Sequence, residues 1–372
     1  MLSLHRSRFC QLSGLYLRKL IKRRSFSTKR IYDAKAGLYS VPVRFRNNKG
    51  DLITLDAVYQ DTMPEGGQRA TVFAVHGAPG THADFKYLVP QLKNNNVRMI
   101  MPNFPGLGFT PSDPRLCCEN EERNEFAQAV LDSVDNLGTT ALIFMGHSRG
   151  GENALQIATS ELNVVGRSSS AIFPTDGRSL KEKVRGIVML NAAGLRIHRG
   201  IQPYWKIDYF IRLLDLEVFN FILEPFLYFV YNRIMGLKVP TGAAAAMALR
   251  AMRTFGYEKI LPSVETVNSR PEIKLLHAFS GQDYFIQADV SRELAMKFEN
   301  RVDLECSTYD SKDVTRATIE AFSGGAQTVS VNFVDEGHFL QKFRAQYLID
   351  VILALVSELS PTIRPDVDLS TN

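Results

Sequence analysis

A serine between two glycines is the first feature of this sequence that could carry out chemistry. In the stretch GHSRGG, Gly146 and Gly150 flank Ser148 in the pattern G-x-S-x-G. In that pattern a strained turn between a strand and a helix lifts the hydroxyl above a sheet, and glycines flank it because side chains there would collide with backbone. An apolar run precedes the motif (142–145) and a helical pattern follows it (152–162). This context favours a nucleophile over the alternative, a serine in an ordinary turn.

A serine hydroxyl becomes a strong nucleophile only when a base removes its proton and an acid orients that base. With this motif the acid comes second along the chain and the histidine last. Asp283 follows a predicted strand at 273–279, and His338 follows another at 329–334. The candidate triad is therefore Ser148, Asp283 and His338.

Other histidines and carboxylates compete for the two partner roles. The competing histidines precede or adjoin the serine, or lie in a predicted cap or inside a strand. The competing acids lie between the last two predicted strands or beside the candidate base. They are His76, His82, His147, His198 and His277 for the base, and Asp310, Asp313 and Glu336 for the acid.

Backbone donors for a developing oxyanion are also predicted. Residues 76–80 read HGAPG directly after a strand. The N–H groups of Ala78 and Arg149 are expected to converge on the substrate oxygen. The other residues are expected to shape the loop: His76, Gly77, Pro79 and Gly80. For the Arg149 side chain, contact with an acidic substrate and an ordinary surface ion pair are both open.

Strands alternating with helices are expected to position these residues. A hairpin is predicted at 40–61 around a turn at 47–50. Short apolar runs follow as further strands, and 120–138 and 339–359 have helical patterns. These runs are 70–77, 97–104, 140–146, 184–191, 273–281 and 329–338. Such alternation predicts a doubly wound, mostly parallel α/β sheet.

Two segments interrupt the alternation. Residues 195–269 hold no predicted strand, are helical in pattern and are rich in aromatic residues, which indicates an inserted helical cap. Their most apolar stretch, 218–231, contains Glu224 and Pro225 and is shorter than the ~20 apolar residues of a membrane span, so no span is predicted. Contact of the cap with a membrane surface stays open. The second segment, 303–327, is expected to be a surface insertion.

The charge of the chain is concentrated at its N-terminus. The net charge is +5 over 372 residues, but residues 1–30 carry nine Lys and Arg and no acid, which leaves −4 for residues 31–372. The folded part is therefore not expected to bind nucleic acid. The leader, 1–30, is amphipathic and acid-poor, as mitochondrial transit peptides are. We expect a mitochondrial matrix location, with a cytoplasmic one as the alternative.

The four cysteines and the histidines form no metal-ligand pattern. No metal and no cofactor are expected.

The motifs HGAPG, GHSRGG, GQD and EGH resemble those of the α/β-hydrolase superfamily, in the same order, over residues 40–358. The stretch HGAPGTHADFKYL is similar to a little-characterised group of nematode hydrolase-like proteins of unknown function. The resemblance implies an eight-stranded, mostly parallel sheet with a helical cap after the sixth strand. It also implies Ser148 as nucleophile, His338 as base and Asp283 as its orienting acid. Relatives that open epoxides or displace halide have aspartate at the serine position, so Ser148 argues against those reactions.

The spacing of acid and base departs from the superfamily pattern. Asp283 and His338 are 55 residues apart, from 338 minus 283, which is longer than is usual. The 303–327 segment can account for the extra length. The choice of Asp283 as the acid therefore requires that 303–327 is an insertion between the acid and the base.

The expected organisation is a leader (1–30), a hydrolase core (31–194 and 270–360), a cap (195–269) and a tail (361–372). The leading functional hypothesis is a serine hydrolase that cleaves an ester or thioester with an apolar acyl or alkyl group, a small or lipid-like molecule. The alternatives are a C–C bond hydrolase or an acyltransferase on the same triad, and a non-catalytic binding protein that keeps the fold. The oligomeric state is left open.

Overall fold

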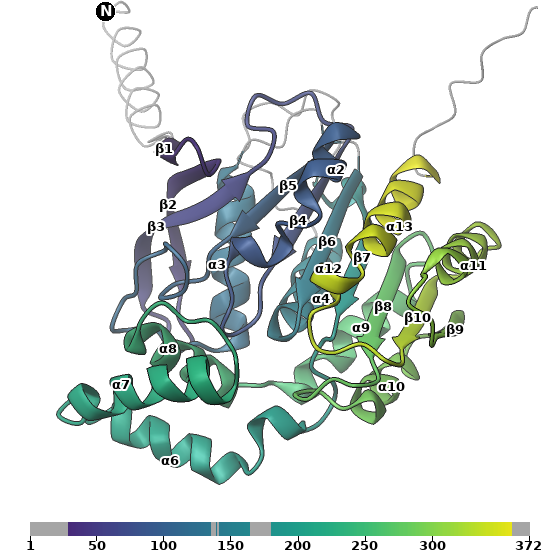
Figure 1. Ribbon diagram of the computed structural model, residues 1–372. Helices are drawn as coiled ribbons and strands as arrows, with labels where there is room; N and C mark the ends of the chain where they lie inside the picture. Colours follow the sequence, from purple (N-terminus) through teal and green to yellow (C-terminus); the bar gives the residue numbers. More distant parts are fainter. Residues whose placement is uncertain (1–28, 135–138, 140, 164–179, 359–372) are drawn as a thin grey trace, which may run out of the picture.

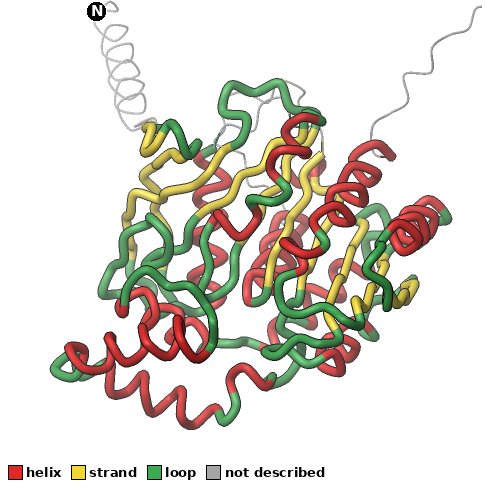
Figure 2. Tube along the Cα trace, in the orientation of Figure 1, coloured by secondary structure: helices red, strands yellow, loops and turns green. Residues whose placement is uncertain are grey.

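The structure, a computed structural model, describes residues 29–134, 139, 141–163 and 180–358. The expected leader lies outside these residues except for its last two, and the expected tail lies wholly outside them. Within the described part a ten-stranded sheet runs through the centre, with helices on both of its faces (Figure 1; Figure 2). The predicted class, a doubly wound α/β sheet, is confirmed.

Seven parallel strands and three antiparallel strands make up the sheet. Their order is β1-β2-β3-β5-β4-β6-β7-β8-β10-β9. The strands are β1 (Arg30–Asp33), β2 (Leu38–Arg46), β3 (Leu52–Asp61), β4 (Ala70–Val75), β5 (Val97–Pro102), β6 (Ala141–His147), β7 (Val184–Leu190), β8 (Lys274–Ser280), β9 (Arg301–Cys306) and β10 (Thr328–Phe333). All neighbours from β5 to β9 in this order are parallel. Their carboxyl ends therefore share one edge, where residues that follow different strands can meet.

Helices cover each face of the sheet over its own apolar core. One face carries α3 (Asn120–Ser133), α4 (Arg149–Asn163), α9 (Leu261–Asn268) and α10 (Ala288–Ala295). The other face carries η1 (His82–Phe85), α2 (Val89–Asn94), α11 (Lys312–Ser323), α12 (Leu340–Phe343) and α13 (Ala345–Glu358). Strand β6 supplies both cores, because Leu142 and Phe144 face one and Ile143 and Met145 face the other. This explains why such strands are continuous apolar runs in the sequence.

The sheet has ten strands rather than the eight expected. Strand β1 extends one edge beside β2, and β9 extends the other edge beside β10. Together β9 and α11 form an extra strand–helix unit between β8 and β10 in the chain. This unit occupies the segment expected to be a surface insertion, and it accounts for the long interval between the candidate acid and base.

The single C-terminal helix expected at 339–359 is two helices. The chain breaks between α12 and α13 at Arg344. The guanidinium of Arg344 donates hydrogen bonds to the carbonyls of Thr308 and Tyr309 and pairs with Glu336 at 2.9 Å. Because of the break, α12 contacts η1 and β8, whereas α13 packs against α11 and α2 on the same face.

The helices between β7 and α9 make up most of the segment expected to be the cap, and α6, α7 and α8 lie at the lower left of Figure 1. The helices of this segment are η2 (Arg199–Ile201), α6 (Tyr204–Leu214), α7 (Asn220–Phe229), the π-helical η3 (Val230–Ile234), α8 (Gly242–Arg253) and η4 (Tyr257–Lys259). Although α9 falls inside the range expected for the cap, it packs against the core helix α4. Within the described residues, every helix is too short or too polar to cross a membrane.

The buried His277 in β8 should make folding stability depend on pH. Neither of its ring nitrogens has a hydrogen-bond partner among the described residues, and burial lowers its pKa from 6.5 to about 4. Between pH 6.5 and pH 4, His277 binds a proton in the unfolded chain but stays neutral in the folded protein. The free energy of unfolding therefore falls as the pH drops through this range. The expected loss from this group is up to about 3 kcal/mol at pH 4.

We predict that His277→Leu removes this part of the acid destabilisation. Urea unfolding at pH 7, 6 and 5 should give a shallower fall for the variant than for the unmodified chain. Ser330→Ala, a change at its cross-strand partner on β10, removes no titrating group and should keep the original slope. If the free energy of unfolding falls equally with pH in His277→Leu and in the unmodified chain, His277 does not cause the acid destabilisation.

Candidate active site

Ser148 occupies the sharp turn between β6 and α4. Its φ angle is +54°, in the left-handed region that non-glycine residues rarely adopt. Its backbone N–H donates to the carbonyl of Leu190 at 2.8 Å, which fixes the turn against the end of β7. Strained backbone of this kind persists only where the surroundings enforce it, and it is frequent at active sites.

The glycines around Ser148 let three backbone segments meet almost without space between them. A Cβ on Gly146 would lie 2.0 Å from the carbonyl oxygen of Gly150, and one on Gly150 would lie 2.2 Å from that of Val75. A Cβ on Gly151 would lie 2.5 Å from the Cβ of Ala192. A side chain at Gly146 or Gly150 would force β6, α4 and β4 apart, and one at Gly151 would push α4 away from the segment after β7. The G-x-S-x-G pattern is thus a packing requirement of this turn.

The two other triad candidates are in direct contact. His338 Nδ1 lies 2.7 Å from Asp283 Oδ2. The same carboxylate accepts hydrogen bonds from Asn191 Nδ2 at 2.8 Å and from the backbone N–H groups of Phe285 and Ile286 at 2.8 and 3.0 Å. Asp283 is therefore held by four donors, and it presents one oxygen to the imidazole.

The environment of Asp283 keeps its carboxyl group ionised. Burial acts to raise its pKa, but the hydrogen bond and charge of His338 and the two backbone N–H groups outweigh burial and hold the pKa below its usual value. An ionised Asp283 accepts the Nδ1–H of His338, which leaves Nε2 as the nitrogen able to take up a proton.

His147 links the sharp turn at Ser148, which we call the elbow, to His338. Its Nε2 donates to the backbone carbonyl of His338 at 2.7 Å, and the two rings lie 4.8 Å apart. Burial lowers the pKa of His147 to about 3, so the ring is neutral and acts here as a fixed donor. The contact places the residue next to Ser148 directly against the candidate base.

The hydroxyl of Ser148 is without a hydrogen-bond partner in the part of the chain that the structure describes. In structures without substrate, the bond between nucleophile and base is often long and tightens only on binding. His147 holds the elbow and His338 together. The hydrogen bond between the Ser148 hydroxyl and the His338 imidazole is not formed in this structure.

The loop after β4 lies against the nucleophile. A Cβ on Gly77 would lie 3.0 Å from the Cβ of Ser148 and 3.5 Å from its Oγ, so the next residue, Ala78, begins beside the hydroxyl. On the other side Arg149 is the first residue of α4, where backbone N–H groups have no partner within the helix. Both expected oxyanion donors therefore flank Ser148.

Side chains shape this loop as expected. His76 is fully buried; its Nδ1 donates to the carbonyl of Gly77 at 2.8 Å and its Nε2 accepts from the N–H of Phe104 at 3.1 Å. Burial lowers the pKa of His76 to about 3, so it is neutral. A Cβ on Gly80 would lie 2.6 Å from Asp84 Oδ2. Pro79 lies between Ala78 and Gly80 in the same tight loop.

The Arg149 side chain fits neither of the two roles left open for it. It is fully buried, not at the surface, and it connects the elbow to the segment that follows α8. Its Nη2 donates to the carbonyl and hydroxyl of Thr254 at 2.7 and 3.1 Å, and its guanidinium lies 3.9 Å from the ring centre of Phe255. Its Nη1 lies 3.9 Å from the buried carboxylate of Glu152.

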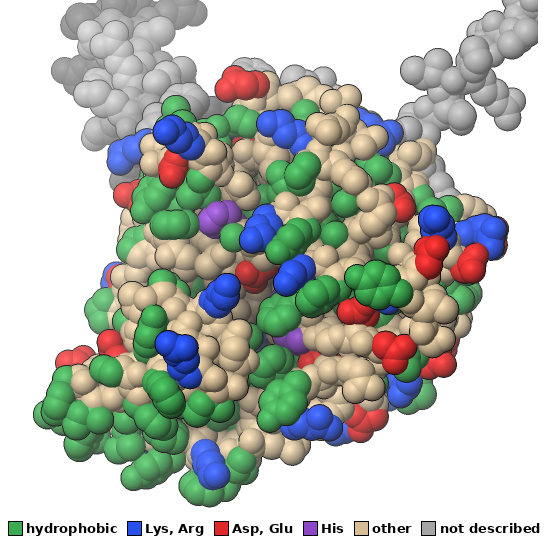
Figure 3. Space-filling view, viewed as in Figure 1, with side chains coloured by type: hydrophobic (Ala, Val, Ile, Leu, Met, Phe, Trp, Pro, Cys, Tyr) green, Lys and Arg blue, Asp and Glu red, His purple; other side chains and the backbone are tan. Residues whose placement is uncertain are grey.

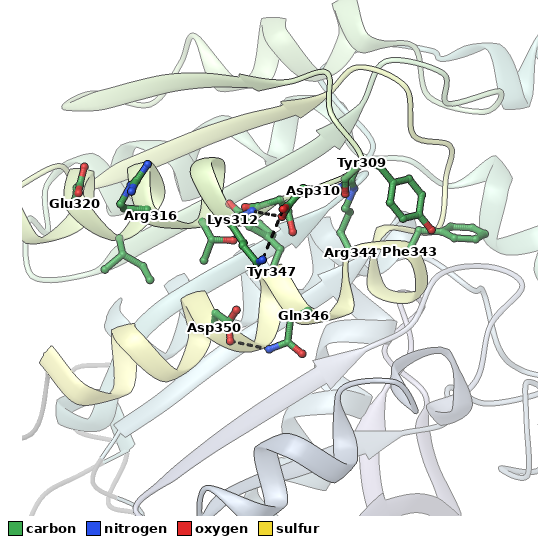
Figure 4. Close-up of a pocket in the computed structure, with 13 residues that line it drawn as sticks. Tyr309, Asp310, Lys312, Arg316, Glu320, Phe343, Arg344, Gln346, Tyr347 and Asp350 are labelled. Atoms are coloured by element: carbon green, nitrogen blue, oxygen red, sulfur yellow. Dashed lines mark hydrogen bonds and ion pairs between the residues drawn. The ribbon is translucent and has the colours of Figure 1, made fainter.

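The competing acids lie in other contacts. Asp310 pairs with Lys312, Asp313 with Arg316, and Glu336 with Arg344. Asp310 lies at a groove of about 1050 Å³ between α11 and α13 (Figure 4). None of the three triad candidates lines this groove. Only Asp283 among these acids contacts His338.

The competing histidines are also held elsewhere. His82 Nδ1 lies 3.0 Å from Asn103 Oδ1, and His198 Nδ1 donates to the carbonyl of Phe285 at 3.0 Å. His277 is buried inside β8. In the described ranges, 29–134, 139, 141–163 and 180–358, no group of three His, Cys, Asp or Glu side chains could hold a metal ion.

Two positioning residues were not found from the sequence. Asn191 follows β7 and holds Asp283, and His147 holds the backbone of His338. Asn191 lies at the carboxyl end of a predicted strand, the same signal that identified Asp283 and His338. His147 gave no comparable signal, because its role depends on a contact with a residue 191 positions away.

The sequence and the structure are similar to known hydrolases. A family model described as "Alpha/beta hydrolase of unknown function (DUF1057)" matches residues 35–357. The uncharacterized protein F35H12.5 of Caenorhabditis elegans is 31% identical over 337 residues, which cover 88% of this chain and 90% of that protein.

More distant similarities are to a phospholipase in sequence and to an esterase in structure. The phospholipase YtpA of Bacillus subtilis is 24% identical over 139 residues, which cover 37% of this chain and 51% of that protein. An esterase from Thermogutta terrifontis has a TM-score of 0.51 at 15% identity, covering 87% of this chain and 99% of that one. At such identity a structural likeness shows the fold alone.

We predict that Gly150→Ala disrupts the elbow. The added methyl group would overlap the carbonyl of Val75, and we expect a loss of about 2 kcal/mol or more in the free energy of unfolding. The matched control is Gly186→Ala in β7, where the new methyl group would be 3.5 Å from its nearest neighbour. Equal stabilities of the two variants in urea unfolding would refute the packing argument.

We also predict that Arg149→Leu loosens the attachment of the cap. The change leaves the Thr254 carbonyl without its donor and Glu152 without its nearest cation, so it should cost about 1–3 kcal/mol. Protease cleavage near Thr254 should become faster. In the control Arg212→Leu, an exposed pair with Asp208 is lost, and stability should change by less than about 1 kcal/mol. Similar losses in both variants would contradict the role of Arg149.

Proposed function

Because this chain belongs to the α/β-hydrolase family DUF1057, we propose that it is a serine hydrolase that cleaves a carboxylic ester or thioester. The observation that carries the proposal is the 2.7 Å contact between His338 and an ionised Asp283, next to a serine in a strained elbow. A binding protein that merely kept the fold would have no need of this arrangement. The sequence similarity to the phospholipase YtpA supports the same class of reaction.

In the proposed reaction His338 Nε2 takes the proton of Ser148 as Oγ attacks the carbonyl carbon of the substrate. The carbonyl oxygen becomes an oxyanion, which the N–H groups of Ala78 and Arg149 receive. The helix α4 begins at this point, and the positive end of its dipole favours the negative charge.

The tetrahedral intermediate then collapses to an acyl-enzyme. His338 returns the proton to the leaving alcohol or thiol, and the acyl group stays on Ser148. Water repeats the sequence: His338 takes a proton from water, hydroxide attacks the acyl carbon, and Ser148 regains its hydrogen. Asp283 stays ionised throughout and stabilises the imidazolium.

The aromatic and aliphatic content of the cap is the basis for proposing an apolar acyl or alkyl group in the substrate. A cavity of about 350 Å³ lies at the seam between the cap and the loop that follows β5. Small and apolar side chains form part of its wall, among them Ala243, Ala246, Met247 and Leu214. Polar and charged side chains, among them Glu224 and Arg250, line the rest, and none of the three triad candidates lines this cavity.

The test is labelling of the full chain with a fluorophosphonate, which reacts covalently with activated serines. We expect Ser148→Ala to abolish labelling and His338→Ala to reduce it strongly. Asp283→Asn should slow it by a factor on the order of 10³ to 10⁴, because the imidazole loses its orienting partner.

Two controls separate loss of chemistry from loss of folding. Ser311→Ala changes a half-buried residue before α11, and Asp289→Asn changes an exposed residue of α10; both lie outside the candidate triad, and both variants should label like the unmodified chain. A folded chain that does not label, or that labels equally in Ser148→Ala, would refute the proposal. Given labelling, p-nitrophenyl esters of increasing acyl length would then show whether an apolar acyl group is preferred.

A further inference from the structure

Exposed apolar side chains are concentrated on the cap. Of the 23 large apolar residues that are exposed within the described part, twelve lie between residues 204 and 234. We call these twelve side chains the cap patch; they lie in α6, α7, η3 and the loop between α6 and α7. Its members are Tyr204, Trp205, Tyr209, Leu216, Val218, Phe219, Phe221, Ile222, Phe226, Tyr228, Phe229 and Ile234. Its most exposed members are Phe221 (75%), Ile234 (68%), Val218 (66%) and Trp205 (65%). Figure 3 shows apolar side chains gathered at the lower left, over α6 and α7.

Helix α7 is apolar except for Asn220 and Glu224, which line the seam cavity, and it is buried on one side only. Leu227 points inward, while Phe221, Ile222, Phe226 and Phe229 are exposed. A soluble helix normally keeps polar residues on its outer face, and a helix that is apolar all round is normally covered all round. The outer face of α7 therefore lacks a cover.

The charges around the cap patch favour a lipid surface as that cover. The one charged residue of α7, Glu224, lines the seam cavity and not the outer face. On α6 the acid Asp208 pairs with Arg212 at 2.8 Å. Lys206 and Arg233 are exposed beside the patch. Two acids, Asp215 and Glu217, are exposed in the α6–α7 loop, and Asp215 forms an ion pair with Arg250. The border of the patch thus carries the basic residues Lys206 and Arg233 together with Glu217, while the charge of Asp215 is offset by Arg250.

We propose that the cap patch docks this protein onto the surface of a lipid bilayer that contains anionic headgroups. Helices that lie in a membrane interface place Trp, Phe and Leu toward the acyl chains and Lys or Arg toward the headgroups. The α6–α7 pair also projects from the body of the molecule, so its tip can reach a flat surface (Figure 1).

The test uses the single tryptophan of the chain, Trp205, which lies in the cap patch. The full chain carrying Ser148→Ala is mixed with phosphatidylcholine vesicles, with and without phosphatidylglycerol. We expect it to sediment with the anionic vesicles. We also expect Trp205 emission to shift to the blue and to become less accessible to acrylamide. Ser148→Ala removes hydrolysis, so failure of the proposed reaction does not affect this result.

The variant Phe221→Ser/Ile222→Ser keeps the tryptophan and removes two exposed apolar side chains. It should bind the anionic vesicles at least about tenfold more weakly, since each lost side chain removes favourable burial. The matched control is Tyr309→Ser/Phe343→Ser, which removes two exposed aromatic residues beside α11 and in α12. The control should bind like the parent chain, and thermal melting should show all three folded.

Three outcomes would overturn the proposal. The first is absence of vesicle binding. The second is vesicle binding that leaves Trp205 emission unchanged, or that persists in Phe221→Ser/Ile222→Ser. Either result would mean that the basic leader, residues 1–30, binds the anionic vesicles and the cap patch does not. The third is a dimer in lipid-free sedimentation that the patch variant dissociates, which would make a second copy the cover of the patch.

Discussion

The close approach of three backbone segments at Ser148 is the constraint on which the rest of the site depends. With hydrogen atoms in place of side chains at Gly146 and Gly150, helix α4 can begin directly at the end of β6 and against β4. This contact forces the left-handed φ of Ser148 and turns its side chain out of the sheet. It also places the first N–H groups of α4 next to that side chain. Nucleophile position and anion stabilisation therefore come from one packing arrangement.

The remaining polar groups extend this arrangement outward. His147 and Arg149, on either side of the serine, are buried and point to different partners: one to the backbone of His338, the other to Thr254 near the cap. Asn191 joins the end of β7 to Asp283. The elbow is thus tied to the base, the acid and the cap by hydrogen bonds from adjacent residues. Buried polar groups of this kind hold a geometry well because leaving any of them unpaired is costly.

The sequence predicted the features that depend on local pattern. Continuous apolar runs identified the central strands, and residues placed after strand ends identified Asp283 and His338, which the structure brings into contact. The resemblance to a nematode hydrolase family is confirmed. Strand β9 was missed because its sequence, RVDLEC, alternates charged and apolar residues at an edge and contains no apolar run. The buried roles of His147 and Arg149 depend on contacts between distant residues, which no local pattern encodes.

The extra strand–helix unit of β9 and α11 has a consequence for how such proteins are recognised. In a parallel sheet the residues that follow β8 and β10 meet at one edge whatever the length of chain between the two strands. An added unit that joins the far side of β10 lengthens that chain and leaves Asp283 and His338 in contact. A search pattern that fixes the number of residues between acid and base would therefore pass over this chain. A pattern based on strand order would find it.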